Sequence, residues 1–291
     1  MSPAGRTPAF RVAAVQTRPV FGDVEGNVRR ALALASRVRA DLYVFPELMT
    51  SGYVFVDRKE ALALAETPGA RGARAPGLSL LEAWARGRGV HAIAGFPERD
   101  GRLVYNSAAL IGPRGVKDVY RKIHLFFEEK LWFVPGNRPP RLTRIGPARV
   151  GMLICYDWRF PELMRVLALA GADLVAHPSN LVFQEAQQAM LVRALENRLW
   201  LVTANRVGED VRPGRRMAFT GRSQIAGPDG RPAAPLGPRA RPAVLAARVD
   251  LAAARDKRIT ARNDLLADRR PEMYRPLARL RPPQAPVSRR K

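Results

Sequence analysis

The chain has 291 residues, of which 47% are hydrophobic, so it is long enough to bury a continuous core. No stretch of 18 residues lacks charge, which predicts a soluble globular protein and excludes a membrane-spanning segment. The formal net charge of +23 raises nucleic acid as a partner. However, the arginines are spread through almost every segment, whereas a binding arm would concentrate them among aromatic residues, so we treat nucleic-acid binding as a minor alternative.

The start of the chain, MSPAGRTPAFRVAAVQ, has no uninterrupted apolar segment after its first basic residue and does not resemble a secretory signal. The single cysteine, Cys155, cannot form an internal disulfide, which fits a reducing compartment. We therefore expect a cytoplasmic protein. The role of Cys155 is either packing or chemistry, and that choice decides the function.

Short apolar, β-branched runs alternate with longer segments of helical period, a pattern typical of a layered α/β fold. In chain order the predicted elements are a strand at 10–17, a helix at 26–40, a strand at 41–47, a helix at 78–89, strands at 90–98, 105–113, 116–122 and 149–156, a helix at 160–172, a strand at 172–178, a helix at 184–198, a strand at 199–208, and a strand, turn and strand within 223–251. No repeat or linker divides them. We predict one domain over residues 9–270, with a flexible start at 1–8 and a basic, Pro-rich tail at 271–291.

Three predicted strands end in reactive side chains, namely Glu47 after DLYVFP, Lys122 after VKDVYR and Cys155 after VGMLI. In open α/β sheets, side chains at the carboxyl ends of strands converge on a crevice. Each residue alone has an ordinary explanation, as a solvated loop end, a surface charge or a small core residue. Their shared position after strands favours one common site.

These residue types suit hydrolysis of an amide or a nitrile. The Cys155 thiol, with an ordinary pKa near ~8.5, is mostly protonated at neutral pH and needs a base, for which Glu47 is the candidate. The Lys122 ammonium and the backbone N–H of Tyr156 are candidates to stabilise the oxyanion, each donor worth roughly 3 kcal/mol. Glu47 could also pass the proton to the leaving nitrogen and then activate water.

The segments FPELMTSGY, YRKIHLFFEEK and GMLICYDWRFPEL resemble, in order and spacing, the three motif blocks of the nitrilase superfamily of carbon–nitrogen hydrolases. Later segments at 177–181, 193–208 and 219–230 resemble the same family, so the similarity runs from about residue 10 to about residue 265. The resemblance implies a four-layer αββα sandwich whose subunits pair through helices into a layered homodimer or higher homo-oligomer.

The resemblance also implies a second glutamate downstream of the lysine, which positions the lysine or assists proton transfer. Glu129 matches that place, and Glu128 is its neighbour. The alternative for Glu129 is a solvated loop charge. His124 matches a structural position in the family, and the three histidines have no metal-ligand spacing, so we predict no metal and no cofactor.

The substrate is harder to predict. Arg159 matches an arginine that binds a substrate carboxylate in N-carbamoyl amino acid hydrolases of this superfamily, although a structural ion pair with Asp157, Glu162 or another acid is the equal alternative. Its segment also resembles that of dicarboxylate mono-amide hydrolases, which differ mainly at Trp158. Further candidates to line the pocket are Tyr156, Asn180 and Phe127.

The sequence therefore predicts a cysteine-dependent hydrolase that releases ammonia from an amide or N-carbamoyl group of a small, carboxylate-bearing substrate through a thioester. Hydrolysis of aliphatic nitriles by the same residues is the first alternative. A non-catalytic binding protein on the same fold is a further one, which the presence of Glu47, Lys122 and Cys155 disfavours.

Overall fold

The computed structural model describes residues 10–279, which fall into two compact units divided between Asp256 and Lys257. The second unit holds an isolated bridge between Arg258 and Asp264, a short 3-10 helix at Pro271–Met273 and α8 at Arg275–Arg279. The division into a domain at 9–270 and a tail at 271–291 stays a prediction. The start predicted to be flexible (1–8) and the end of the predicted tail (280–291) lie outside the described residues.

The first unit contains two mixed β-sheets. The six-stranded sheet has the order β13-β1-β2-β3-β4-β5, and the five-stranded sheet has the order β12-β9-β8-β7-β6. The strands of the first sheet are β1 Phe10–Gln16, β2 Leu42–Val44, β3 His91–Asp100, β4 Leu103–Gly112, β5 Gly115–Arg121 and β13 Ala243–Val249. Those of the second sheet are β6 Thr143–Ile145, β7 Ala148–Met152, β8 Leu174–Ser179, β9 Trp200–Asn205 and β12 Gln224–Ala226.

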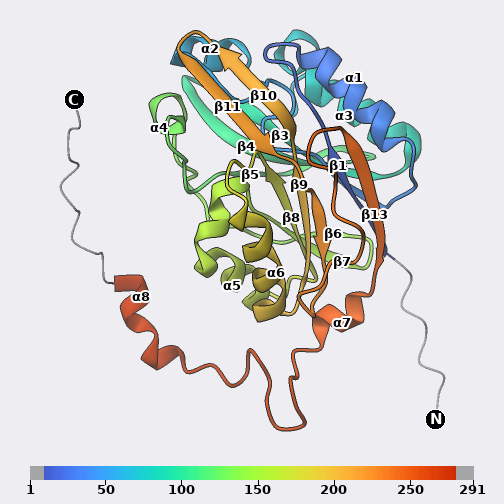
Figure 1. The fold of residues 1–291 in the computed structure, drawn as a ribbon, viewed down its shortest axis with the longest axis vertical. Helices are drawn as coiled ribbons and strands as arrows, with labels where there is room; N and C mark the ends of the chain where they lie inside the picture. The colour runs from blue at the N-terminus through green and yellow to red at the C-terminus, as the bar shows by residue number, and fades with distance from the viewer. Residues whose placement is uncertain (1–9, 280–291) are drawn as a thin grey trace. The chain divides into compact units, whose positions relative to one another are not determined.

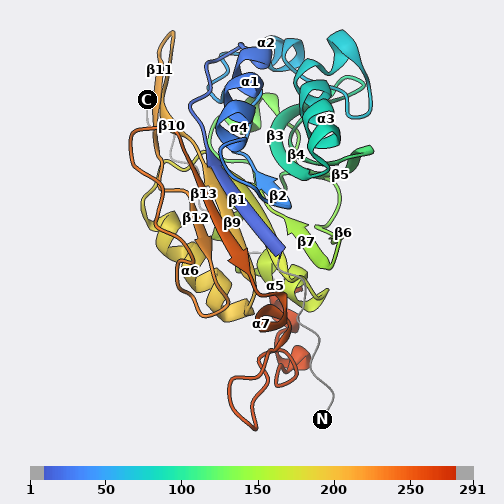
Figure 2. The same cartoon turned by 90° about the vertical axis from the view of Figure 1, so that its right-hand side faces the viewer.

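Helices cover the outer face of each sheet. Helices α1 (Val24–Ala35) and α3 (Pro76–Arg88) lie on the six-stranded sheet, and α5 (Pro161–Leu169) and α6 (Glu185–Asn197) lie on the five-stranded sheet (Figure 1). Turned by 90°, the same ribbon shows α1 and α3 and the pair α5 and α6 on opposite sides of the strands (Figure 2). This is the predicted four-layer αββα arrangement.

The strand β1 is apolar without a break from Val12 to Val15, and its two faces explain why. Val12 and Ala14 belong to the core between the sheets, whereas Ala13 and Val15 belong to the core under α1 and α3. Because successive side chains of a strand point to opposite faces, a strand covered on both faces has no polar alternation.

Local signals set the helix ends. The Asp23 side chain accepts a hydrogen bond from the Gly26 N–H and caps α1. Helix α3 begins at Pro76, which needs no N–H partner there, and is capped after Arg88 by Gly89, which takes the left-handed conformation (φ +67).

Three predicted strands differ from the structure. The run at 199–208 is two strands, because the chain leaves the sheet after β9 at the buried Arg206 and continues as β10 (Val207–Arg212), which pairs with β11 (Arg215–Thr220). The run predicted at 41–47 ends at Val44. The run predicted at 149–156 ends at Met152, and a 3-10 turn follows at Cys155–Arg159.

Some short elements of the first unit were not predicted, because they lack a clear period. They are α2 Arg58–Ala63, a 3-10 turn at Gly72–Arg74, α4 Glu129–Trp132, β6, β11 and α7 Leu251–Arg255.

No helix in residues 10–279 is long and apolar enough to cross a membrane.

Candidate active site

Four of the predicted site residues lie together, three of them after the carboxyl ends of strands and the fourth at the start of a short helix. Glu47 follows β2, Lys122 follows β5, Cys155 follows β7, and Glu129 opens α4. Glu47 and Lys122 are 0% exposed, Glu129 is 3% exposed and Cys155 is 6% exposed. Four ionisable side chains are thus enclosed in the fold, and such burial is costly unless each group has partners.

Lys122 connects the two glutamates. Its Nζ donates to Oε1 of Glu47 at 2.6 Å and to Oε1 of Glu129 at 2.7 Å. Glu129 Oε1 also accepts from the Tyr53 hydroxyl at 2.5 Å, and Glu47 Oε1 accepts from the Asn106 amide at 2.7 Å. The other oxygen of Glu47, Oε2, is buried and has no hydrogen-bond partner among the described residues.

The electrostatics of this cluster keep the lysine charged and the thiol protonated. Burial by itself would lower the pKa of Lys122, but Glu129 and Glu47 outweigh it and raise that pKa above its ordinary value. Burial, followed by the charge of Glu47, raises the pKa of the Cys155 thiol well above its usual range, against the opposing effect of Lys122. Burial also raises the pKa of Glu129 to about 6, although the charge of Lys122 opposes this.

Cys155 lies at a strained turn. Its φ of +41 falls in the left-handed region, which a residue with a side chain adopts at a cost of about 1–3 kcal/mol unless its surroundings hold it there. The buried His177 donates from Nε2 to the Cys155 carbonyl at 3.0 Å, and its Nδ1 accepts from the Thr203 hydroxyl at 3.1 Å. Burial lowers the pKa of His177, so the neutral ring holds the Cys155 backbone in place.

Asp157 organises the rest of the turn. Its buried carboxylate accepts from the backbone N–H of Ile154 at 3.1 Å and from the Tyr120 hydroxyl at 2.7 Å. Its Oδ1 also lies 2.9 Å from Nδ1 of His124, whose ring stacks on Phe160 at 3.5 Å. These contacts place His124 in the support of the turn, as the family resemblance implied.

Two glycines allow the site segments to approach each other. A Cβ on Gly95 of β3 would lie 2.5 Å from the Glu47 Cα, and one on Gly136 would lie 2.2 Å from the Arg121 carbonyl oxygen, beside Lys122. Both distances are too short for a side chain. The sequence therefore needs glycine at these positions to bring the backbones of Glu47 and Lys122 into place.

The predicted pocket residues divide between two cavities and the surface. Tyr156, Trp158 and Asn180 line a cavity of about 10 Å³ at Cys155, which Phe126, Leu181, Val182 and Phe183 complete. The Asn180 side chain also donates to the Glu47 carbonyl at 2.9 Å. Phe127 is 65% exposed and lines a separate cavity of about 230 Å³ next to Glu129.

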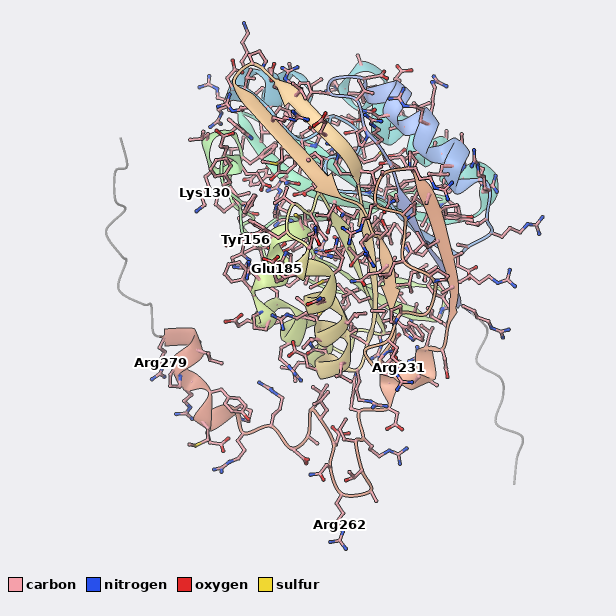
Figure 3. The ribbon with its side chains drawn as sticks, in the orientation of Figure 1. Lys130, Tyr156, Glu185, Arg231, Arg262 and Arg279 are labelled. Atoms are coloured by element: carbon pink, nitrogen blue, oxygen red, sulfur yellow. The ribbon has the colours of Figure 1, made fainter. Side chains whose placement is uncertain are left out.

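Arg159 does not line either of these two cavities. Its guanidinium lies over the Trp158 ring at 4.5 Å and pairs with Glu185 at 3.1 Å, and both charged side chains are about half exposed (45% and 53%). Lys130 of α4, Tyr156 of the 3-10 turn and Glu185 of α6 lie along the same side of the molecule in Figure 3. In this conformation Arg159 takes part in a surface ion pair, which was one of the two alternatives.

Sequence reasoning missed Tyr53 and Asn106, which hold Glu129 and Glu47. A signal for each was present, because Tyr53 ends the segment FPELMTSGY and Asn106 is a polar residue inside the apolar strand YNSAALIG. Among the described residues, no group of three or more His, Cys, Asp or Glu side chains is placed to hold a metal ion.

Comparison with known proteins identifies relatives of this chain along most of its length. Residues 11–259 match the family described as carbon–nitrogen hydrolase. A protein named nitrilase from Pyrococcus abyssi is 42% identical over 267 residues, which cover 91% of this chain and 98% of that protein. An (R)-stereoselective amidase from a Pseudomonas species is 35% identical over 76% of this chain and 79% of its own length.

A solved structure shows the same fold with a modified cysteine. It is a variant of the amidase from Nesterenkonia sp. AN1 with covalent addition of the acetamide moiety of fluoroacetamide at the active-site cysteine. It superposes with a TM-score of 0.74 at 29% identity and covers 94% of this chain and 99% of its own. Together with the matched segment and the relatives, this likeness shows that the chain belongs to the carbon–nitrogen hydrolase family of the nitrilase superfamily and is a hydrolase of carbon–nitrogen bonds.

Proposed function

We propose that the protein hydrolyses an amide or N-carbamoyl group of a small, carboxylate-bearing substrate, with Cys155 as nucleophile, through a thioester and with release of ammonia. The observation that carries this proposal is that the two oxygens of the Glu47 carboxylate have different surroundings. Lys122 and Asn106 bind Oε1 of Glu47, while Oε2 is buried without a partner among residues 10–279. A carboxylate held by one oxygen and free at the other is suited to accept and return a proton.

In the first half-reaction, Glu47 takes the proton of the Cys155 thiol as sulfur attacks the carbonyl carbon. The π electrons of the carbonyl move to oxygen, where the Lys122 ammonium and the Tyr156 backbone N–H stabilise the negative charge. The carbon–nitrogen bond then breaks, Glu47 passes its proton to the leaving nitrogen, and ammonia departs from the thioester. The raised pKa of Cys155 supports this order, because a thiol that stays protonated at neutral pH needs a base at the moment of attack.

In the second half-reaction, Glu47 removes a proton from water, and the resulting hydroxide attacks the thioester carbon. The second tetrahedral intermediate collapses, the carbon–sulfur bond breaks, and the proton on Glu47 returns to sulfur. Glu129 keeps Lys122 in place through its 2.7 Å contact, and Tyr53 in turn holds Glu129. We assign Glu129 as a positioning residue in both half-reactions.

The cavity at Cys155 limits what can enter. At about 10 Å³ it has room for roughly one water molecule. An amide group is larger than this cavity. Its entry therefore requires side chains that line the cavity, such as Phe126 and Phe183, to move apart. Their rings are in edge-on contact at 5.9 Å.

Nitrile hydrolysis is the second candidate, supported by the 42% identity to the protein named nitrilase. The same thiol would add to the nitrile carbon to give a thioimidate, and attack of water on it would lead to the same thioester with loss of ammonia. The two activities differ in the substrate and in the steps before the thioester.

The test is ammonia release from N-carbamoyl amino acids, dicarboxylate mono-amides, plain aliphatic amides and small dinitriles, each run beside Cys155→Ala. We expect release from at least one amide or carbamoyl substrate and none with Cys155→Ala. Release only from nitriles would favour the second candidate, and release that persists without the thiol would refute cysteine catalysis.

We also propose that two copies pair through α5 and α6. Four large apolar side chains of these helices are between 44% and 50% exposed: Val166, Leu169, Val192 and Leu195. Clusters of exposed apolar residues on helices are typical of interfaces between subunits. Light scattering after size exclusion should give twice the monomer mass or more, and Val192→Glu with Leu195→Glu should reduce it; a monomer in the unaltered protein would contradict the pairing.

A further inference from the structure

A second cavity lies beside the reacting cluster. Its volume is about 230 Å³, against about 10 Å³ at Cys155. It begins at Glu129 and Tyr53, the pair that holds Lys122, and extends to the hairpin of β10 and β11. The residues that matter for its chemistry are Tyr53, Phe127, Glu128, Glu129, Trp132 and Arg215. The cavity is thus large enough for the part of a small substrate that lies away from the reacting bond.

Arg215 brings hydrogen-bond donors to this cavity. Its Nε donates to Oε2 of Glu128 at 2.9 Å, and its two terminal nitrogens have no partner among the described residues. The guanidinium carbon lies 5.6 Å from the centre of the Trp132 ring. The two side chains of this ion pair are only 28–29% exposed, so water is partly excluded from their charges.

Trp132 forms part of the wall of this cavity. Its side chain is buried at 4% exposure, and its indole Nε1–H is enclosed in the fold without a hydrogen-bond partner among the described residues. The terminal nitrogens of Arg215 only donate hydrogen bonds, so they call for an acceptor such as a carboxylate.

The hairpin of β10 and β11, which carries Arg215, is connected by hydrogen bonds to the segment that holds the reacting cluster. Asp210 of β10 accepts hydrogen bonds from the backbone N–H groups of Tyr53 at 2.9 Å and Val54 at 3.1 Å. Asp210 also pairs with the fully buried Arg206 at 2.9 and 3.0 Å. The hairpin is thus anchored at the residue that holds Glu129, which fixes the donors relative to the reacting groups.

We propose that Arg215 binds the carboxylate of the substrate, in place of the sequence candidate Arg159. The inference rests on the proposed hydrolysis and names the specificity residue of that same site. Arg159 is about half exposed and paired with Glu185, whereas Arg215 keeps its terminal nitrogens unpaired at the larger cavity. Arginine suits this task because its planar fork matches the two oxygens of a carboxylate.

The experiment compares two substrates that differ at one end. One is the mono-amide of butanedioic acid, and the other is butanamide, in which a methyl group replaces the carboxylate. For Arg215→Gln we expect the KM of the mono-amide to rise roughly ten- to a hundredfold with kcat little changed, because a charge-assisted contact to the ground state is lost. The kinetic constants for butanamide should change less than about threefold.

Two further variants sharpen the assignment. Glu128→Gln removes the negative charge next to Arg215 and should lower the KM of the mono-amide. Arg29→Gln is the matched control, since it removes the same charge from a side chain that is 65% exposed, is paired with Glu25 and does not line this cavity, and it should change little.

Equilibrium binding separates this inference from the proposed function. Calorimetry with the mono-amide and Cys155→Ala should detect binding that Arg215→Gln weakens by the same factor, whether or not the unaltered protein turns the substrate over. If this binding persists but no ammonia is released, the hydrolysis proposal alone is refuted. Three outcomes would overturn the assignment of Arg215. They are equal losses for both substrates with Arg215→Gln, a carboxylate preference that disappears with Arg159→Gln, and no binding at all.

Discussion

The reacting cluster and the neighbouring Arg215 cavity are built from different kinds of structure. Glu47, Lys122 and Cys155 follow strands of the two central sheets and are at most 6% exposed. The ion pair of Arg215 with Glu128 joins a hairpin outside both sheets to the residue before a four-residue helix, and it is 28–29% exposed. In the first region nearly every charged side chain is paired inside the fold. In the second region the terminal nitrogens of Arg215 have no hydrogen-bond partner among the described residues.

Under the two proposals, chemistry and selectivity belong to separate parts of the molecule. A buried ion network is rigid, and removal of one member leaves the others as uncompensated charges. A partly exposed ion pair contributes little to stability, so its residues can change with little effect on the fold. Substitutions in the cluster should therefore affect kcat and folding, whereas substitutions at the cavity should affect KM for particular substrates.

The largest effect is expected for Cys155→Ser. The hydroxyl is a weaker nucleophile with a higher pKa, and Glu47 is poorly matched to deprotonate it, so kcat should fall by at least about a thousandfold. The unfolding midpoint should change little, because the side chains have nearly the same size. Single-turnover ammonia release and thermal unfolding check both points, and substantial retained activity would contradict thiol catalysis.

Lys122→Met should have the next largest effect. It removes the charge that we propose stabilises the oxyanion, so kcat should fall roughly a hundred- to a thousandfold, more than KM rises. It also leaves Glu47 and Glu129 together without a cation, so one carboxylate should be protonated at neutral pH.

Lys130→Met is the matched control for this change. It removes the same charge from an exposed position in α4, one residue after Glu129. Its kcat should stay within about twofold of the unaltered protein. A Lys122 variant that changes only KM would contradict the role of Lys122 at the oxyanion.

Asp210→Asn tests the anchor between the two regions. The substitution leaves Arg206, which is 0% exposed, without its counter-charge, and should lower the free energy of unfolding by about 3–5 kcal/mol. Urea unfolding measures this loss. In the same hairpin Arg216→Gln breaks an exposed ion pair and should cost about 0–1 kcal/mol. Similar losses in the two variants would remove the distinction between buried and exposed pairs.

The same comparison explains what the sequence could predict. Glu47, Lys122 and Cys155 were predictable because each lies at the end of a predicted strand, and the order of the layers followed from the family resemblance. Arg215 was not, because its partner Glu128 lies 87 positions away and neither residue belongs to a periodic segment. The end of the strand before Cys155 was predicted wrongly since composition does not show where a chain turns, and here the turn depends on a φ of +41 held by distant partners such as His177.

Tyr53 belongs to both regions, because it lines the Arg215 cavity and its hydroxyl donates to Glu129 at 2.5 Å. Glu129 must be ionised to hold the Lys122 ammonium, and burial raises its pKa to about 6. As the pH falls through 6 Glu129 gains a proton, so kcat/KM should decline on the acid side of about pH 6. Burial and the charge of Glu129 raise the pKa of Tyr53 itself well above its usual range, so the phenol remains a donor throughout this interval.

The smallest predicted effect is a shift of this acid limb in Tyr53→Phe. The Tyr53 hydrogen bond favours the ionised form of Glu129, so its loss should raise the pKa of Glu129 and move the limb to higher pH, while activity at alkaline pH stays close to that of the unaltered protein. Tyr120→Phe makes the same change at a buried tyrosine that donates to Asp157 instead, and it should leave the position of the limb unchanged. A pH profile of kcat/KM for all three proteins decides the matter. A limb that stays in place or moves to lower pH in Tyr53→Phe would mean that Glu129 does not set it, and the acid limb would then report another group of the cluster.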